Sequence, residues 1–180
     1  MATILDGKAL AASIRQELKE EAALLPRRPG IAVILVGDDP ASRRYVRNKG
    51  LDSEECGFFS RSFLLPGDVS EEEVLGIINK LNADPAIDGI LVQLPLPPTM
   101  DEERIIEAIV PEKDVDAFHP LSMGRMVRGD ARIWPCTPAG IEVMLDTYSI
   151  PVEGKVCVMV GRSEIVGKPM GFCCSAATAP

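Results

Sequence analysis

The chain has 180 residues, of which 46% are hydrophobic and 26% are charged, so it can bury the core of one globular domain or slightly more. Its formal net charge of -8 at pH 7 argues against a surface that binds nucleic acid by neutralising phosphates. No apolar run approaches the roughly 18 residues that span a bilayer, and no export signal is recognisable, so we expect a cytoplasmic protein with no membrane partner.

The cysteines and the histidine limit the possible chemistry. The chain has 5 cysteines, an odd number without an export signal, which favours reduced thiols over a disulfide framework. None of them forms a Cys-x-x-Cys pair, so no metal site is expected. His119 is the only histidine, and a hydrolytic triad therefore has little support.

The first elements alternate between helix and strand. Residues 7 to 25 place apolar side chains at helical spacing, which predicts a helix. Residues 30 to 37 are almost wholly apolar, as is typical of a strand covered on both faces. A helix from about residue 42 to 56 and a strand over residues 58 to 65 are expected next.

A capping motif and a third strand follow. Ser70 with Glu73 predicts a helix that continues to about residue 82. Its inward positions are expected to be Leu75, Ile78 and Leu81. Residues 88 to 95 read as a strand with Gln93 near its carboxyl end, where open α/β sheets place their ligands. A glutamine that points to solvent is an equally good interpretation from local sequence.

The repeated order of strand and helix predicts a parallel sheet with helices on both faces. A short helix over residues 101 to 109 and a loop over residues 111 to 120 come next. Further along, Thr137 is expected to cap a helix whose first residue is Pro138 and which runs to about residue 148.

The last recognisable segment has the parts of a nucleotide site. Residues 155 to 160 read as another buried strand, and residues 161 to 169 form a glycine turn that should open a helix. The spacing is not Gly-x-Gly-x-x-Gly, so the pattern alone is weakly specific. Arg162 either pairs with a phosphate or is an ordinary surface arginine.

Tyr45 and Lys49 form the most suggestive pair of polar residues. They are four residues apart on the predicted helix, so they lie on one face about one turn apart. The ring could stack on a flat heterocycle while the amine moves protons. An ordinary solvated helix face would show the same spacing.

Five motifs, in the same order along the chain, resemble those of one known family. They are Ser42-x-x-Tyr45-Val46-x-x-Lys49, Asp88-Gly89-Ile90-Leu91-Val92-Gln93-Leu94-Pro95-Leu96-Pro97, Pro111-x-Lys113-Asp114-Val115-Asp116, Pro135-Cys136-Thr137-Pro138-x-Gly140 and Gly161-Arg162-Ser163-x-Ile165-Val166-Gly167-x-Pro169. The chain therefore resembles the bifunctional methylenetetrahydrofolate dehydrogenase/cyclohydrolase family. Short-chain dehydrogenases also have a Tyr-x-x-x-Lys pair, but their nucleotide turn precedes it, whereas here the order is reversed.

The resemblance implies an α/β fold with a parallel-sheet folate-binding catalytic domain over residues 1–118. An incomplete Rossmann-type NADP-binding domain would follow over residues 119–180. It also implies a homodimer that oxidises 5,10-methylenetetrahydrofolate with NADP and hydrolyses the methenyl product to 10-formyltetrahydrofolate, in the one-carbon metabolism that supplies purine biosynthesis.

Roles for individual residues also come from the resemblance. Lys49 would be the catalytic lysine of the hydrolysis, Tyr45 would pack on the folate, and Gln93 would hold Lys49 in place. Asp116 would accept hydrogen bonds from the pterin's amide and amino edge. The residues expected to meet NADP are Gly161, Arg162 and Ser163, with Arg162 a candidate for the extra phosphate.

The sequence departs from the family at two notable places. Ala117 stands where the family usually has glycine, which would matter only if the position needs a positive φ. From about Cys173 the family usually continues with a leucine-rich helix, and leucine codons read one base out of register encode Cys-Cys-Ser. We therefore expect a frameshifted tail, or alternatively a natural short variant. A non-catalytic folate-binding or dimerising fragment is the competing function.

Overall fold

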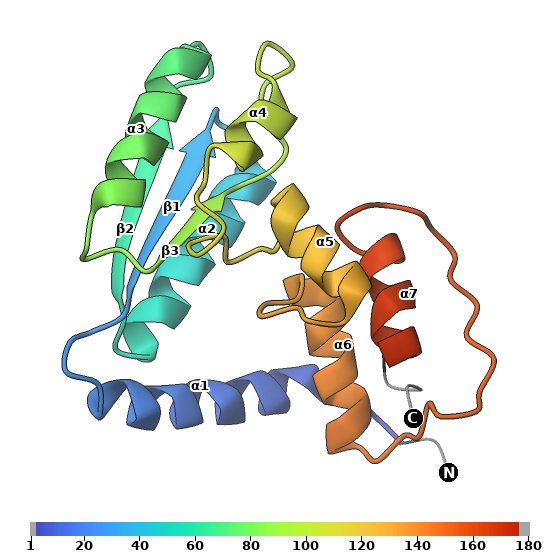
Figure 1. Cartoon of the computed structure of the whole chain (residues 1–180). Helices are drawn as coiled ribbons and strands as arrows, with labels where there is room; N and C mark the ends of the chain where they lie inside the picture. Colours follow the sequence, from blue (N-terminus) through green and yellow to red (C-terminus); the bar gives the residue numbers. More distant parts are fainter. Residues whose placement is uncertain (1–2, 177–180) are drawn as a thin grey trace. The chain divides into compact units, whose positions relative to one another are not determined.

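The structure, a computed structural model, describes residues 3–176 (Figure 1). They pack as two compact units, one of residues 11–115 and one of residues 3–10 together with 116–176. These units are defined by packing, whereas the predicted boundary after residue 118 concerns function and stays a prediction. Within the described residues, no helix is long and apolar enough to cross a membrane.

The unit of residues 11–115 is built on a parallel sheet of three strands. Strand β1 (Gly30–Val36) lies between β2 (Phe59–Leu65) and β3 (Gly89–Val92). Gly30 pairs with Phe59 on one side, and both ladders are parallel. The predicted parallel α/β fold is confirmed, and the apolar run at residues 30 to 37 is its central strand.

The predicted helices of this unit are present with shifted ends. They are α2 (Pro40–Glu55), α3 (Glu71–Ala83), α4 (Glu102–Glu107) and α1 (Gly7–Ala23), of which residues 7–10 belong to the other unit. The Ser70 hydroxyl accepts the Glu73 N–H at 3.2 Å, as the capping motif predicts. Helix α2 begins two residues before its predicted start at residue 42, because Asp39 caps it and Pro40 fits its first turn.

Side chains of β1 fill hydrophobic clusters on both faces of the sheet. The larger cluster is formed by Ala32, Ile34, Val36, Val74, Ile78, Leu81, Ile87, Ile90, Val92, Met100, Ile105 and Ile109. The smaller one joins Val33, Leu35 and Leu91 to Val46 of α2. On α3, Val74 is fully buried and the predicted inward residue Leu75 is only partly buried, since helix rotation brings Val74 onto the line of Ile78 and Leu81.

The other unit is mainly helical. Helices α5 (Pro120–Arg128) and α6 (Cys136–Thr147) both contact α7 (Gly167–Ala176). The prediction that Thr137 caps α6 is wrong, because Pro135 occupies the cap position and Thr137 lies inside the first turn. Pro138 is tolerated there, since the first N–H groups of a helix have no acceptor within it.

The predicted strand over residues 155 to 160 is absent. Those residues have no regular secondary structure, and Val156, Val158 and Val160 are 92%, 78% and 95% exposed. A strand needs a neighbour to supply its ladder hydrogen bonds, and the described residues of this unit contain no other strand. Residues 156–160 are continuously apolar, as the prediction of a buried strand requires, but the described residues of their unit offer no strand with which they could pair.

The expected frameshifted tail is only partly described. Cys173 lies on α7 and is buried, with 2% of its surface exposed. Residues 177–180 lie outside the described residues.

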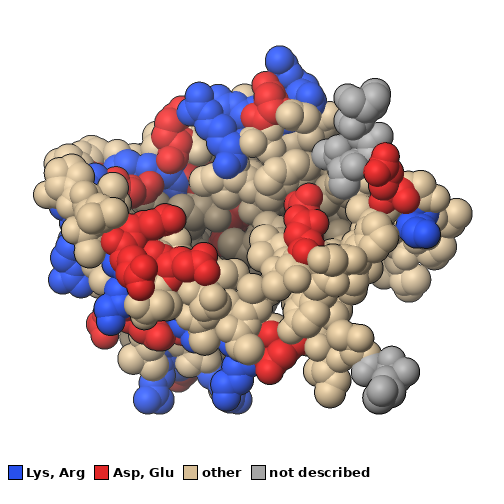
Figure 2. Space-filling model, turned by 90° about the horizontal axis from the view of Figure 1, so that it is seen from below, with Lys and Arg blue, Asp and Glu red and all other residues tan. Residues whose placement is uncertain are grey.

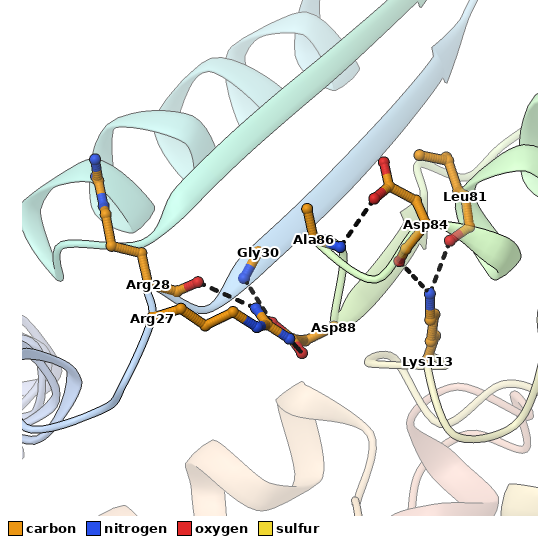
Figure 3. A network of polar contacts seen from close by, with 8 residues as sticks. All are labelled: Arg27, Arg28, Gly30, Leu81, Asp84, Ala86, Asp88 and Lys113. Atoms are coloured by element: carbon orange, nitrogen blue, oxygen red, sulfur yellow. Dashed lines mark hydrogen bonds and ion pairs between the residues drawn. The ribbon is translucent and has the colours of Figure 1, made fainter.

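A polar network holds the amino end of the sheet (Figure 3). The Arg27 guanidinium donates to both oxygens of the Asp88 carboxylate, at 2.7 and 2.5 Å, and the Gly30 N–H donates to the same carboxylate at 2.8 Å. The hydrogen bond from Arg27 lowers the pKa of Asp88. Lys113 donates to the carbonyls of Leu81 and Asp84, both at 2.8 Å, and so closes the end of α3.

Charges of both signs lie on the surface shown in Figure 2, where Lys and Arg side chains are interspersed with Asp and Glu. The acidic residues that give the chain its net charge of -8 therefore do not form one continuous acidic patch on this face.

Candidate active site

The amino end of α2 is fixed by its cap. The Asp39 carboxylate accepts the Ser42 N–H at 2.7 Å, and this bond lowers the pKa of Asp39. Ser42 and Val46, one turn apart, are both buried, so this face of α2 packs on the sheet. The helix rotation is thereby set by Val46, which contacts the smaller hydrophobic cluster.

That rotation decides where Tyr45 and Lys49 lie. Tyr45 is 62% exposed, while Lys49 is half-buried one turn further along α2. The Ser53 hydroxyl donates to the Lys49 carbonyl at 2.7 Å and so supports the backbone at that turn. An exposed ring and a partly enclosed amine therefore lie along the same side of the helix.

The structure brings Lys49 and Gln93 together. The Lys49 Nζ donates to the Gln93 Oε1 at 3.3 Å, and the Gln93 Nε2 donates to the Leu94 carbonyl at 2.8 Å. Gln93 directly follows β3, and its N–H continues the ladder by donating to the Ile34 carbonyl at 2.8 Å. Its side chain is therefore held at both ends, with the oxygen toward the amine. Among the described residues, no carboxylate forms an ion pair with Lys49.

An open hollow lies beside the exposed ring. It is lined by Pro40, Ala41, Arg44, Tyr45 and Asn48. The last four of these recur at helical spacing, so the sequence itself places them on one face of α2. Arg44 adds a cation next to the ring, within reach of an anionic group on a bound molecule.

The loop before Asp116 packs along β3. The Ile90 N–H donates to the Lys113 carbonyl at 2.7 Å, and Ile90 forms a parallel bridge with Asp114. A side chain at Gly89 would overlap Val115, so glycine permits this close approach. Three residues of the motif that ends in Asp116, namely Lys113, Asp114 and Val115, therefore serve to pack this loop against β3.

Asp116 and Ala117 belong to the unit that contains α5 to α7. Asp116 is half-buried, and Ala117 has a φ of 58°. The position therefore does need a positive φ, so the replacement of the family's usual glycine by Ala117 matters. A left-handed conformation costs a non-glycine residue about 1–2 kcal/mol.

The glycine turn has a structural role of its own. The Ser163 hydroxyl accepts the N–H groups of Val166 and Gly167, at 3.2 and 3.1 Å, and so satisfies donors at the start of α7. A side chain at Gly167 would lie 2.7 Å from the Gly161 carbonyl oxygen, which shows how tightly the turn closes. Arg162 is exposed and has no ion pair among residues 3–176.

Metal binding has no support in the described part of the chain. No group of three or more His, Cys, Asp or Glu side chains there could hold a metal ion.

Comparison with known proteins gives a consistent result. Residues 5–116 match the model for the catalytic domain of tetrahydrofolate dehydrogenase/cyclohydrolase, and residues 135–180 match the model for its NAD(P)-binding domain. The chain belongs to the tetrahydrofolate dehydrogenase/cyclohydrolase family. The family resemblance read from the five sequence motifs is therefore confirmed.

Relatives of this family share about half of the residues. The bifunctional protein FolD of Geotalea uraniireducens is 52% identical over 177 residues, which are 97% of this chain and 63% of that protein. The FolD protein of Halalkalibacterium halodurans is 55% identical over 173 residues, covering 94% of this chain and 62% of that protein. The chain thus spans less than two thirds of these relatives.

Solved structures of family members have the same fold. The Campylobacter jejuni FolD crystal structure matches with a TM-score of 0.95 at 45% identity, over 98% of this chain and 64% of that one. The Trypanosoma brucei enzyme, solved with NADP cofactor and an inhibitor, matches with a TM-score of 0.95 at 36% identity, over 99% and 62%.

Proposed function

We propose that the chain binds a tetrahydrofolate at α2 and hydrolyses 5,10-methenyltetrahydrofolate to 10-formyltetrahydrofolate. The observation that supports this most directly is the hydrogen bond between Lys49 and Gln93 beside the exposed ring of Tyr45. The pterin would stack on Tyr45, and the Lys49 amine would move a proton between the attacking water and the folate. Gln93 supplies a neutral acceptor, so it positions the amine without cancelling its charge.

The second half of the proposal is oxidation of 5,10-methylenetetrahydrofolate with NADP, which accepts a hydride when bound. Arg162 fits this role as an exposed cation without an ion pair among the described residues, and it would hold a phosphate. Gly167 allows the backbone to close tightly against Gly161, whose φ of 142° favours glycine. Ser163 would act through the turn that it caps, and Asp116 would bind the pterin edge.

We further propose a cytoplasmic homodimer that contributes to purine biosynthesis through one-carbon metabolism, with no nucleic-acid partner. The domain boundary after residue 118 belongs to the same proposal. A folate-binding chain without dehydrogenase activity is the second candidate, and the exposed, unpaired residues 155–160 before the glycine turn favour it.

The loss of methenyl absorbance tests the hydrolysis. Lys49→Ala should lower the rate by about 10²–10⁴-fold, the usual contribution of a positioned acid or base. Arg47→Ala is the matched control, since it removes an exposed cation from the same helix and should keep the rate. Hydrolysis retained in Lys49→Ala would remove Lys49 from the mechanism.

A calorimetric titration separates the two candidates. Binding of NADP as well as a folate analogue supports the dehydrogenase, and Arg162→Ala should then weaken the NADP site only. Folate binding without NADP binding supports the second candidate.

A further inference from the structure

Two cysteines of the mainly helical unit lie next to each other. The Sγ atoms of Cys157 and Cys174 are 3.6 Å apart, in thiol hydrogen-bond contact. Cys157 is exposed and Cys174 is partly buried on α7. Neither residue has a place in the proposed folate chemistry, and the pair comes from segments that sequence spacing alone would not have joined.

We propose that Cys157 and Cys174 form a reversible disulfide, so that this pair is a redox-sensitive site. A disulfide needs its sulfurs about 2.0 Å apart, so the two Sγ atoms must approach by about 1.6 Å. The segment that holds Cys157 belongs to no strand and has no ladder hydrogen bonds to break. A movement of Cys157 toward α7 would therefore break no ladder hydrogen bond.

The oxidant is a low-molecular-weight disulfide such as oxidised glutathione. The exposed Cys157 thiolate attacks it, which forms a mixed disulfide and releases one glutathione. The Cys174 thiolate then attacks the Cys157 sulfur and releases the second glutathione. The protein loses two electrons and two protons, and the oxidant becomes two thiols.

The two buried cysteines, Cys173 and Cys56, compete poorly. Cys173 is adjacent in sequence, but burial raises its pKa to about 11, so it stays a thiol at neutral pH. Burial likewise raises the pKa of Cys56, whose thiol contacts the Arg15 carbonyl at 3.8 Å. Burial also raises the pKa of Cys174, and Cys157 is the exposed member of the pair, so the oxidant reaches Cys157 first.

The bond would close a loop that contains the glycine turn. Cys157 and Cys174 are 17 positions apart, and Gly161, Arg162 and Ser163 all lie between them. Oxidation would tie the exposed segment to α7 and restrict the unfolded chain. The oxidised protein should therefore unfold at a higher temperature than the reduced one.

The experiment treats the full chain with oxidised glutathione, blocks remaining thiols with iodoacetamide and digests it with trypsin. Cleavage after Arg162 places Cys157 on one peptide and both Cys173 and Cys174 on another. Mass spectrometry without reductant should find the two peptides linked, and reductant should separate them.

Adjacent alanine variants identify the partner. Cys174→Ala should lose the linked peptides, whereas the matched control Cys173→Ala should keep them. Cys157→Ser, at an exposed position where misfolding is not expected, should also lose them and show no rise in unfolding temperature. Linked peptides in Cys174→Ala, links only between chains, or no link in the wild type would each overturn the proposal.

Discussion

Replacement of Gly30 by alanine should strongly destabilise the unit of residues 11–115. The added Cβ would lie 2.9 Å from the carbonyl carbon of Ala86 and 3.3 Å from the Cα of Ile87, and it would overlap the Ala86 oxygen. All of these are backbone atoms, so no side chain can rotate away. To make room, β1 would have to move away from the segment that precedes β3. This movement would strain the hydrogen bond that the Asp88 N–H donates to the Gly30 carbonyl at 2.7 Å.

Overpacking costs about 1–3 kcal/mol, and each strained hydrogen bond adds about 1 kcal/mol. We therefore expect a loss of about 3 kcal/mol or more. Gly76→Ala is the matched control, because Gly76 lies inside α3 and nothing lies within 4 Å of its added Cβ. It should stabilise the unit by about 0.5–1 kcal/mol, since glycine is a poor helix former.

Urea unfolding followed by circular dichroism measures both changes. With a slope of about 1–3 kcal/mol/M, the Gly30→Ala midpoint should fall by at least about 1 M, while the Gly76→Ala midpoint rises slightly. Equal midpoints for Gly30→Ala and wild type would show that the backbone beside β1 relaxes easily, and would refute the reasoning.

Three further predictions concern polar contacts and the exposed segment. Lys113→Met should cost about 2 kcal/mol in urea unfolding because it loses two bonds to carbonyls, whereas the exposed Lys80→Met should change little. Asp88 has a lowered pKa in the folded protein, so its contribution is present above its unfolded pKa of about 3.9 and is lost as pH falls through the folded value. Asp88→Asn should therefore flatten the loss of stability below about pH 4 in acid titrations, and an unchanged profile would contradict this. Val158→Lys should reduce any self-association seen by light scattering, because it places a charge in an exposed apolar segment.

Local sequence signals predicted the elements whose residues carry a recognisable pattern within a few positions. The Ser70 cap and the apolar β1 were both readable, because a hydroxyl cap and a doubly covered strand leave marks within a few residues. The prediction that α2 starts at about residue 42 is two residues late, because Asp39 caps the helix and Pro40 fits its first turn. Thr137 is not the cap because the helix already begins at Cys136, with Pro135 in the cap position.

Elements that depend on distant partners could not be read in the same way. Residues 156–160 are as continuously apolar as β1, yet the described residues of their unit offer no strand to pair with them. The spacing of Tyr45 and Lys49 predicted a shared helix face but not the acceptor, because Gln93 is 44 positions away and reaches Lys49 only through the parallel sheet. Only the family resemblance predicted that Gln93 holds Lys49.

The family motifs separate into two groups along the sheet. Asp88 and Lys113 secure its amino end and the end of α3, whereas Gln93 lies at its carboxyl end beside Lys49. Substitutions at the first pair should therefore lower the free energy of unfolding, and any loss of activity should follow the folded fraction. Substitutions at the second pair should lower the hydrolysis rate of a chain that remains folded. The motif at residues 88–97 contains one residue of each group, Asp88 and Gln93. The reason is that β3 runs from the amino end of the sheet, which Asp88 stabilises, to the carboxyl end, where ligands bind in such sheets.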